Sequence, residues 1–139
     1  MLLLDTHVWV WNVEGDVRRV GRRSRRLLSR FESQGALRIS PATLFEVTVL
    51  HTAGRLPLAR PVEQWIREAL SVTSARIAAL SPDIAIDAGQ IPRAALADPM
   101  DRLLVATARQ LDATFLTSDA RILDYASRTR SVRAYDAST

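Results

Sequence analysis

Cysteine and lysine are absent from the 139-residue sequence, and histidine occurs only twice. Without cysteine the chain forms neither disulfides nor thiolate metal sites, and two histidines make a histidine-rich zinc site unexpected. Any metal site must therefore consist mostly of oxygen ligands, which are the ligands that Mg²⁺ and Mn²⁺ prefer.

Long apolar runs are also absent. No run approaches the roughly 20 residues that a membrane-spanning helix needs. The apolar run at residues 1–4 is far too short for a signal peptide, and an acid follows it at once. We therefore expect a cytoplasmic protein with no membrane segment.

Arginine supplies all 19 basic residues, which outnumber 15 acidic residues and give a net charge of +4. A genome rich in G and C is the simplest reason for choosing arginine over lysine. The physical consequence is the same in either case, because guanidinium groups bind phosphate in a fixed, bidentate geometry. A basic chain that also holds a group of acids suits a polyanionic substrate brought to a metal.

Short apolar runs alternate with segments of helical periodicity along the chain. The expected strands lie at residues 1–5, 36–40, 77–80, 113–117 and 131–135. The expected helices lie at residues 17–31, 41–52, 62–72, 82–91, 99–111 and 120–126. This alternation predicts an α/β fold, a three-layer α/β/α sandwich with a central, mainly parallel sheet, formed by one domain over residues 1–139.

Three local assignments depend on competing signals. Residues 6–11 are apolar enough for either a strand or a helix. Ser40 and Pro41 provide a helix cap and a first helical residue, although the β-branched residues that follow also suit a strand. Asp16 is the expected cap of the helix at 17–31, whose arginines form either a solvated face or a surface for RNA or a partner.

Four acids fall where strands end or helices begin, namely Asp5, Asp98, Asp101 and Asp119, and a fifth, Glu46, lies one turn inside its helix and could face the same edge. Asp5 ends the first apolar strand, Asp119 follows the strand at 113–117, and Asp98 and Asp101 begin a helix. In an open parallel sheet these positions share one edge, where ligands bind. Like charges so close together raise one another's pKa, and a divalent cation relieves that cost. The sequence therefore predicts a metal site at this edge.

Each acid also has a purely structural explanation. Asp98 is explained fully as a helix cap, Asp101 suits the third position of a helix, and Asp119 can cap the helix after it. Asp5 could be an ordinary strand-end acid, and Glu46 could lie on the wet edge of its helix. Because an acid that abruptly ends a buried strand favours function, Asp5 carries the metal hypothesis best.

Hydroxyl groups adjoin several of these acids. Thr6, Thr117 and Ser118 stand beside candidate ligands, where a hydroxyl can bind a metal-held water or a phosphate. We take Thr6 and Ser118 as candidate helpers, while His7 has no evident partner and is interpreted as incidental.

Taken in order, these motifs resemble the PIN-domain ribonucleases, and specifically the VapC-type toxins of bacterial toxin–antitoxin pairs. The matching stretches are Leu2-Leu3-Leu4-Asp5-Thr6-His7, Ser40-Pro41-Ala42-Thr43-Leu44-Phe45-Glu46, Gly54-Arg55-Leu56, Asp98-Pro99-Met100-Asp101-Arg102, Ala106-Thr107-Ala108 and Leu116-Thr117-Ser118-Asp119. They span nearly the whole chain, and four such motifs in order are a specific signal although each alone is weak.

The resemblance implies a catalytic Mg²⁺ or Mn²⁺ site formed by Asp5, Glu46, Asp101 and Asp119, with Asp98 as an additional acid that begins the helix or supports the site. Relatives often carry other residues at three places near these motifs, where this chain has Phe45, Leu50 and Leu96-Ala97. None of these departures removes an implied metal ligand. They do change positions at which relatives could contact RNA or carry protons.

The function expected from this resemblance is metal-dependent endoribonuclease activity in the toxin half of a toxin–antitoxin pair. A water activated by the ion would attack the RNA phosphodiester without a covalent enzyme intermediate. The implied partners are an RNA substrate, a cognate antitoxin and a second copy in a homodimer. Two alternatives stay open: a catalytically silent PIN-like module that binds RNA or a partner, and a plain α/β domain whose acids only cap helices.

Overall fold

Three consecutive leucines form the central strand of the sheet, because they are apolar on both faces and fully buried. The computed structural model describes residues 1–139, and every neighbouring pair of strands is parallel, in the order β3-β2-β1-β4-β5. The strands are β1 Leu2–Leu4, β2 Leu37–Ile39, β3 Arg76–Ile77, β4 Thr114–Thr117 and β5 Arg133–Asp136. The predicted α/β sandwich with a parallel sheet is therefore confirmed.

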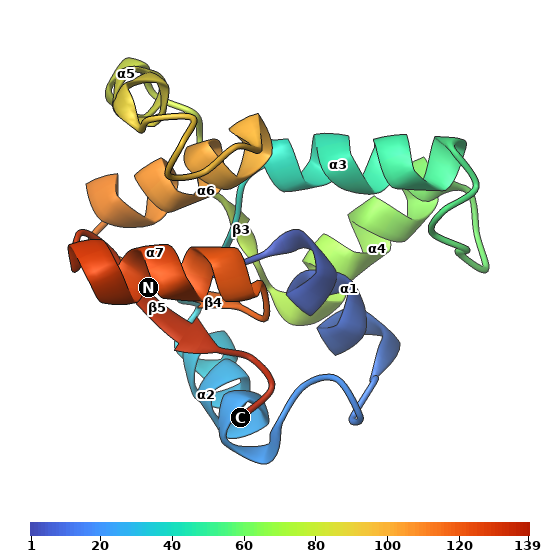
Figure 1. The fold of residues 1–139 in the computed structure, drawn as a ribbon. Coiled ribbons are helices and arrows are strands. Elements are labelled where there is room, and N and C mark those ends of the chain that lie inside the picture. The colour runs from blue at the N-terminus through green and yellow to red at the C-terminus, as the bar shows by residue number, and fades with distance from the viewer.

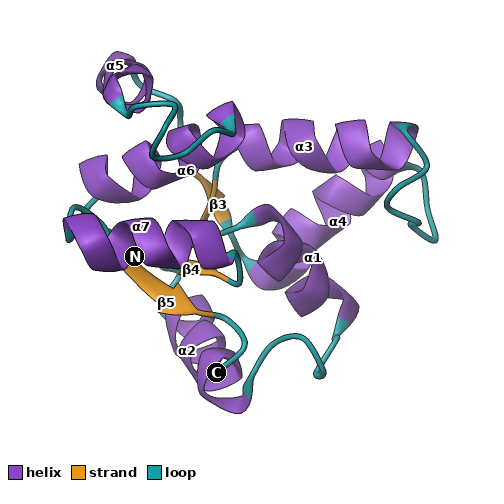
Figure 2. Cartoon of the chain, in the orientation of Figure 1, coloured by secondary structure: helices purple, strands orange, loops and turns teal.

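Seven helices enclose these short strands (Figures 1 and 2). They are α1 Thr6–Glu14, α2 Arg22–Ser33, α3 Pro41–Thr52, α4 Val62–Thr73, α5 Pro82–Gln90, α6 Pro99–Gln110 and α7 Ala120–Thr129. No helix has the length and apolar character needed to cross a membrane. In Figure 1, α5 lies on the outer side of α6 and extends that layer away from the sheet.

Alternate residues of β1 divide the core into two halves, because successive side chains of a strand point to opposite faces. Leu2 and Leu4 pack into the same cluster as Trp9 and Trp65, on the face covered by α1, α2 and α4. Leu3 packs on the other face with residues of α6 and α7. Burial of one strand by both layers therefore fixes the position of its end, where Asp5 lies.

Residues 6–11 belong to a helix, which settles the first of the ambiguous segments. Asp5 begins α1 by accepting a hydrogen bond from the Thr6 main-chain N–H. Trp9 of α1 meets Trp65 of α4 edge-on, with ring centroids 5.3 Å apart, and the indole N–H of Trp65 donates to Glu14 at 2.9 Å. These contacts hold α1 against α4 and so orient the helix that follows Asp5.

The segment at 41–52 is a helix with the predicted bounds, so the alternative of a strand there is wrong. The Ser40 hydroxyl accepts a hydrogen bond from the Ala42 N–H, and Pro41 occupies the first turn. The same arrangement begins α5, where the Ser81 hydroxyl accepts from the Ile84 N–H. A capped start therefore outweighs the β-branched residues of α3.

The helix predicted at 17–31 begins five residues later than expected, at Arg22, and its predicted cap is wrong. Asp16 instead accepts a hydrogen bond from the Arg18 N–H within a turn. Gly21 precedes the helix because its N–H donates to the Ala137 carbonyl at 2.8 Å, and Arg23 N–H donates to the Thr139 carbonyl at 2.9 Å. The C-terminal residues thus determine where α2 starts, and Figure 1 shows the C-terminus beside it.

Two smaller boundaries also differ from expectation. Strand β3 has two residues rather than four, because regular pairing with β2 covers only Arg76 and Ile77. Helix α7 continues three residues beyond its predicted end, to Thr129. The Thr129 hydroxyl donates back to the Tyr125 carbonyl within that added turn.

A polar network joins the three helices on the α6 side. The Arg109 guanidinium donates to both carboxylate oxygens of Asp87, at 2.5 and 3.1 Å, and to the hydroxyls of Tyr125 and Ser131, at 3.2 and 3.1 Å. Burial opposes the charge on Arg109, but its bonds to Asp87 and Tyr125 raise its pKa above the usual value. The bidentate pair therefore stabilises the contact between α5, α6 and α7.

Replacing Gly21 by alanine should destabilise the fold, because the added methyl group would collide with main-chain atoms of Ser138 and Thr139. The collision forces the C-terminal residues away from α2 and breaks the bonds to Ala137 and Thr139. We expect the free energy of unfolding, measured by urea denaturation, to fall by about 1–3 kcal/mol.

Gly89 is the matched control, because it also lies at a helix end but has no atom within 4 Å of an added methyl group. Gly89→Ala should leave stability unchanged or raise it by up to about 1 kcal/mol. Equal effects of the two substitutions would contradict the assigned role of the C-terminal residues.

Candidate active site

Two neighbouring strands bring the first pair of predicted acids together. Asp5 follows the last residue of β1, and its N–H continues the sheet by donating to the Leu116 carbonyl of β4 at 3.0 Å. Asp119 follows the end of β4 by two residues. Because parallel strands end at the same edge, both acids lie at the carboxyl edge of the sheet, as predicted.

A buried threonine links these two acids. The Thr117 hydroxyl donates to one carboxylate oxygen of Asp5 at 2.6 Å and accepts from the Asp119 N–H at 3.0 Å. The other oxygen of Asp5 accepts from the Thr6 N–H at 2.8 Å. The carboxylate of Asp5 is thereby held in one orientation.

The charge on Asp5 is costly in this position. Burial raises the pKa of its carboxyl above the usual value, and the negative charge of Glu46 raises it further. The hydrogen bonds from Thr117 and Thr6 lower the pKa in part, as does nearby His7. Asp5 is therefore a carboxylate that any added positive charge would stabilise.

The second pair of acids lies at the start of α6. Asp98 caps this helix, as predicted, by accepting from the Met100 N–H at 2.8 Å. Asp101 lies in the first turn and is partly buried, with no hydrogen bond to its carboxyl group.

The pKa of Asp101 is raised to about 7. Burial is the largest cause, and the charges of four other acids follow in decreasing order: Asp98, Asp5, Asp119 and Glu46. The other four predicted acids therefore act electrostatically on Asp101, although the five acids come from four separate parts of the chain. A carboxyl group that is half protonated near neutral pH is typical of functional sites.

Helix α3 carries the fifth acid, Glu46, and a buried contact positions that helix. The Thr6 hydroxyl of α1 donates to the Thr43 hydroxyl at 3.3 Å, and both side chains are almost fully buried. Glu46 lies one helical turn beyond Thr43 and is partly buried. Thr6, which we expected to be a helper at the site, thus makes a contact between helices that carry two of the acids.

Asp119 caps α7 by accepting from the Arg121 N–H at 2.8 Å, and its carboxylate also lies 3.6 Å from the Arg121 guanidinium. Ser118, the other expected helper, is exposed and its hydroxyl has no hydrogen-bond partner. The hydroxyl that contacts an acid is that of its neighbour Thr117. From the sequence, Thr117 was one of three candidate hydroxyls, beside Thr6 and Ser118, and nothing distinguished it from them.

The donor set fits a divalent cation in its chemistry. No three of the histidine, aspartate and glutamate side chains form a group ready to hold one metal ion. Five carboxylates nevertheless lie near one edge of the sheet, and burial together with the charges of the other four raises the pKa of Asp101. Oxygen ligands and unbalanced negative charge are what Mg²⁺ and Mn²⁺ require.

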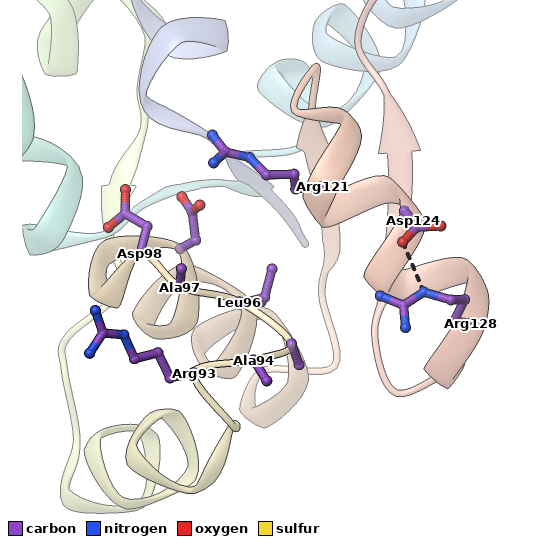
Figure 3. Close-up of a pocket in the computed structure, with 10 residues that line it drawn as sticks. Arg93, Ala94, Leu96, Ala97, Asp98, Arg121, Asp124 and Arg128 are labelled. Atoms are coloured by element: carbon purple, nitrogen blue, oxygen red, sulfur yellow. Dashed lines mark hydrogen bonds and ion pairs between the residues drawn. The ribbon is translucent and has the colours of Figure 1, made fainter.

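A cavity of about 260 Å³ adjoins the acids, between the segment before α6 and helix α7 (Figure 3). Asp98 and Asp101 line it on one side, and Asp124 lines it on the other. Three arginines also line it: Arg93, Arg121 and Arg128. Sequence reasoning missed these arginines, because nothing in their local sequence separates them from the chain's other sixteen arginines.

Comparison with known proteins agrees with this arrangement. The family model described as PIN domain matches residues 2–128. Ribonuclease VapC22 of Mycobacterium tuberculosis is 30% identical over 122 residues, which cover 87% of this chain and 88% of that protein.

Solved structures of similar fold come from toxin–antitoxin complexes. VapBC2 of Rickettsia felis, bound to a DNA fragment from its promoter, has a TM-score of 0.69 at 16% identity, covering 97% of both chains. DNA-bound VapBC of Salmonella typhimurium has a TM-score of 0.67 at 20% identity, covering 97% of this chain and 96% of that one. At such identities these structures support the fold alone. The family match over residues 2–128 and the VapC22 relative show that this chain belongs to the PIN domain family.

Proposed function

We propose that this protein is a metal-dependent endoribonuclease and the toxin half of a toxin–antitoxin pair, with its activity in a single domain over residues 1–139. The observation that carries the proposal is the shared electrostatic environment of Asp5, Glu46, Asp98, Asp101 and Asp119. A set of carboxylates that repel one another in the absence of a cation suits a site built to bind one. The similarity to a ribonuclease supports RNA as the substrate.

Asp5, Glu46, Asp101 and Asp119 are the residues that would hold Mg²⁺ or Mn²⁺. When bound, the ion would supply Lewis-acid activation of water and stabilise charge on the phosphodiester. Thr117 orients Asp5 through the 2.6 Å hydrogen bond, and Asp98 begins the helix that carries Asp101. The chain's own contribution is therefore a fixed set of carboxylates at the edge of a rigid sheet.

The proposed partners follow from the family and from the relatives. Surface arginines are suited to the RNA backbone, so binding should weaken as salt rises. An antitoxin partner is supported by the neighbouring structures, which are toxin–antitoxin complexes. We also propose that the chain forms a homodimer, as the family resemblance implies.

Asp5→Asn should abolish metal-dependent cleavage of RNA. Asparagine is as good a helix cap as aspartate, so α1 should still form, but the negative charge that would bind the ion is lost. Removing charge stabilisation worth several kcal/mol corresponds to a loss of at least about a hundredfold in cleavage rate. The measurement is cleavage of labelled RNA in Mn²⁺, compared with the same reaction in EDTA.

Asp112→Asn is the control for this substitution. Asp112 precedes β4, at the opposite edge of the sheet from the acids, and has a positive φ that asparagine tolerates. Its variant should cleave like the wild type. If Asp5→Asn also cleaves like the wild type, the protein is not the proposed nuclease, and a binding module without catalytic activity becomes the better interpretation.

The raised pKa of Asp101 predicts a specific dependence of stability on pH in the metal-free protein. Its folded pKa, about 7, lies above the value in an unfolded chain, so the folded state binds the proton more tightly. This contribution to stability is complete below about pH 4 and is lost as pH rises through 7.

Asp101→Asn removes the titrating group and the repulsion. Relative to this variant, the wild type should lose on the order of 2 kcal/mol of unfolding free energy between pH 4 and pH 8, after allowing for solvent screening of a partly exposed carboxyl. Urea denaturation in EDTA at several pH values measures the difference. Asp83→Asn, in the first turn of α5, is the control and should follow the wild type. A wild type that parallels Asp101→Asn at every pH would contradict the shared repulsion.

A further inference from the structure

The cavity beside Asp101 is lined by charged and small residues rather than aromatic ones. Its walls are the segment from Arg93 to Asp98 and the facing surface of α7. The first wall carries the small side chains of Ala94, Ala95 and Ala97, and the side chain of Leu96 in the same segment is buried. With no aromatic ring in its lining, the cavity offers no surface on which a nucleobase could stack.

Arginines stand on both sides of this cavity (Figure 3). Arg93 extends from the segment before α6, whereas Arg121 and Arg128 extend from α7. Arg121 and Arg128 are seven residues apart, so they share one helical face and are separated by roughly 10 Å along the axis. Three guanidinium groups thus surround a space that begins at a proposed metal ligand.

These arginines are available to an anion. Arg93 makes no ion pair or hydrogen bond within the chain, and the Arg121 side chain is 80% exposed with only a 3.6 Å contact to Asp119. Arg128 pairs with Asp124 at 2.8 Å, but both side chains are about 60% exposed. Such surface pairs contribute little stability, so a phosphate can replace the carboxylate partner.

We propose that this pocket binds the phosphodiester backbone of the RNA next to the scissile bond, through Arg93, Arg121 and Arg128. The inference rests on the proposed nuclease function, because it assumes that RNA is cleaved beside Asp101, one of the proposed metal ligands. Carboxylates repel an RNA chain, so binding energy has to come from cations set beside them. The pocket supplies those cations at the edge of the acidic site.

The proposal also accounts for the separation of charges along α7. Asp119 caps the helix, Arg121 lies in its first turn and Arg128 lies in its last turn. An RNA strand that follows the pocket would pass from the acids at the start of α7 towards its C-terminal end. Recognition through phosphates alone fixes the position of the strand and leaves its base sequence unread.

The test compares two triple variants that each remove three positive charges. One is Arg93→Gln/Arg121→Gln/Arg128→Gln, in the pocket. The other is Arg55→Gln/Arg60→Gln/Arg67→Gln, around α4, which includes an i,i+4 ion pair of Arg67 with Glu63 like that of Arg128 with Asp124. Binding of a fluorescein-labelled oligouridine is measured by anisotropy in EDTA over a series of salt concentrations, where no metal-dependent cleavage occurs.

The pocket variant should reduce the logarithmic slope of affinity against salt by about 2, because each phosphate contact to a single strand contributes about 0.7. If the two proteins bind equally at ~1 M salt, this change in slope makes the variant bind about a hundredfold more weakly than the wild type at ~0.1 M salt. The control variant should change the slope by less than half as much. If the two variants lose equal affinity, only overall charge matters and the proposal is overturned.

A single substitution distinguishes loss of RNA contacts from unfolding of the triple variant. Arg93→Gln alone removes no interaction within the chain and should lower the slope by about 0.7. No change for Arg93→Gln overturns the proposed role of the pocket. Cleavage in Mn²⁺ is measured on the same proteins: RNA binding that depends on the pocket without any cleavage by the wild type would retain the pocket and reject the nuclease.

Discussion

Mutual repulsion among carboxylates at one edge of the sheet is the constraint on which the site depends. Burial, together with the charges of four other acids, raises the pKa of Asp101 to about 7. Burial and the charge of Glu46 likewise raise the pKa of Asp5. A stable protein tolerates this cost only if rigid elements keep the acids in place. The rigid element here is β1, whose three leucines are fully buried between two helical layers.

Helix starts provide part of the balance. Asp5, Asp98 and Asp119 are the caps of α1, α6 and α7, and each accepts a main-chain hydrogen bond at 2.8 Å. The positive ends of three helix dipoles therefore meet the acids at the same edge. The structural and the functional explanation of a capping acid are then compatible, because a cap uses one oxygen of the carboxylate and leaves the second. In Asp5 that second oxygen accepts one hydrogen bond from the Thr117 hydroxyl and keeps a further lone pair.

The sequence predicted those parts of the fold that depend on local signals. The apolar run of β1 and the capped starts of α3 and α6 are set by neighbouring residues and were predicted, whereas α1 was left open between strand and helix. The start of α2 was predicted wrongly because it depends on hydrogen bonds from Gly21 and Arg23 to residues more than a hundred positions away. The role of the Thr6 hydroxyl was missed for the same reason, since its partner Thr43 lies on a different helix.

The charges around the site also divide into those that local sequence predicts and those that depend on contacts between distant segments. Four of the five acids lie at strand ends and helix starts, which the local sequence reveals. The arginines come together only because α7 packs beside the segment before α6. Arg93 and Arg128 are 35 positions apart in the chain yet line one cavity. In the proposed function an RNA strand would have to reach acids that repel it, and the cations placed beside Asp101 would offset that repulsion.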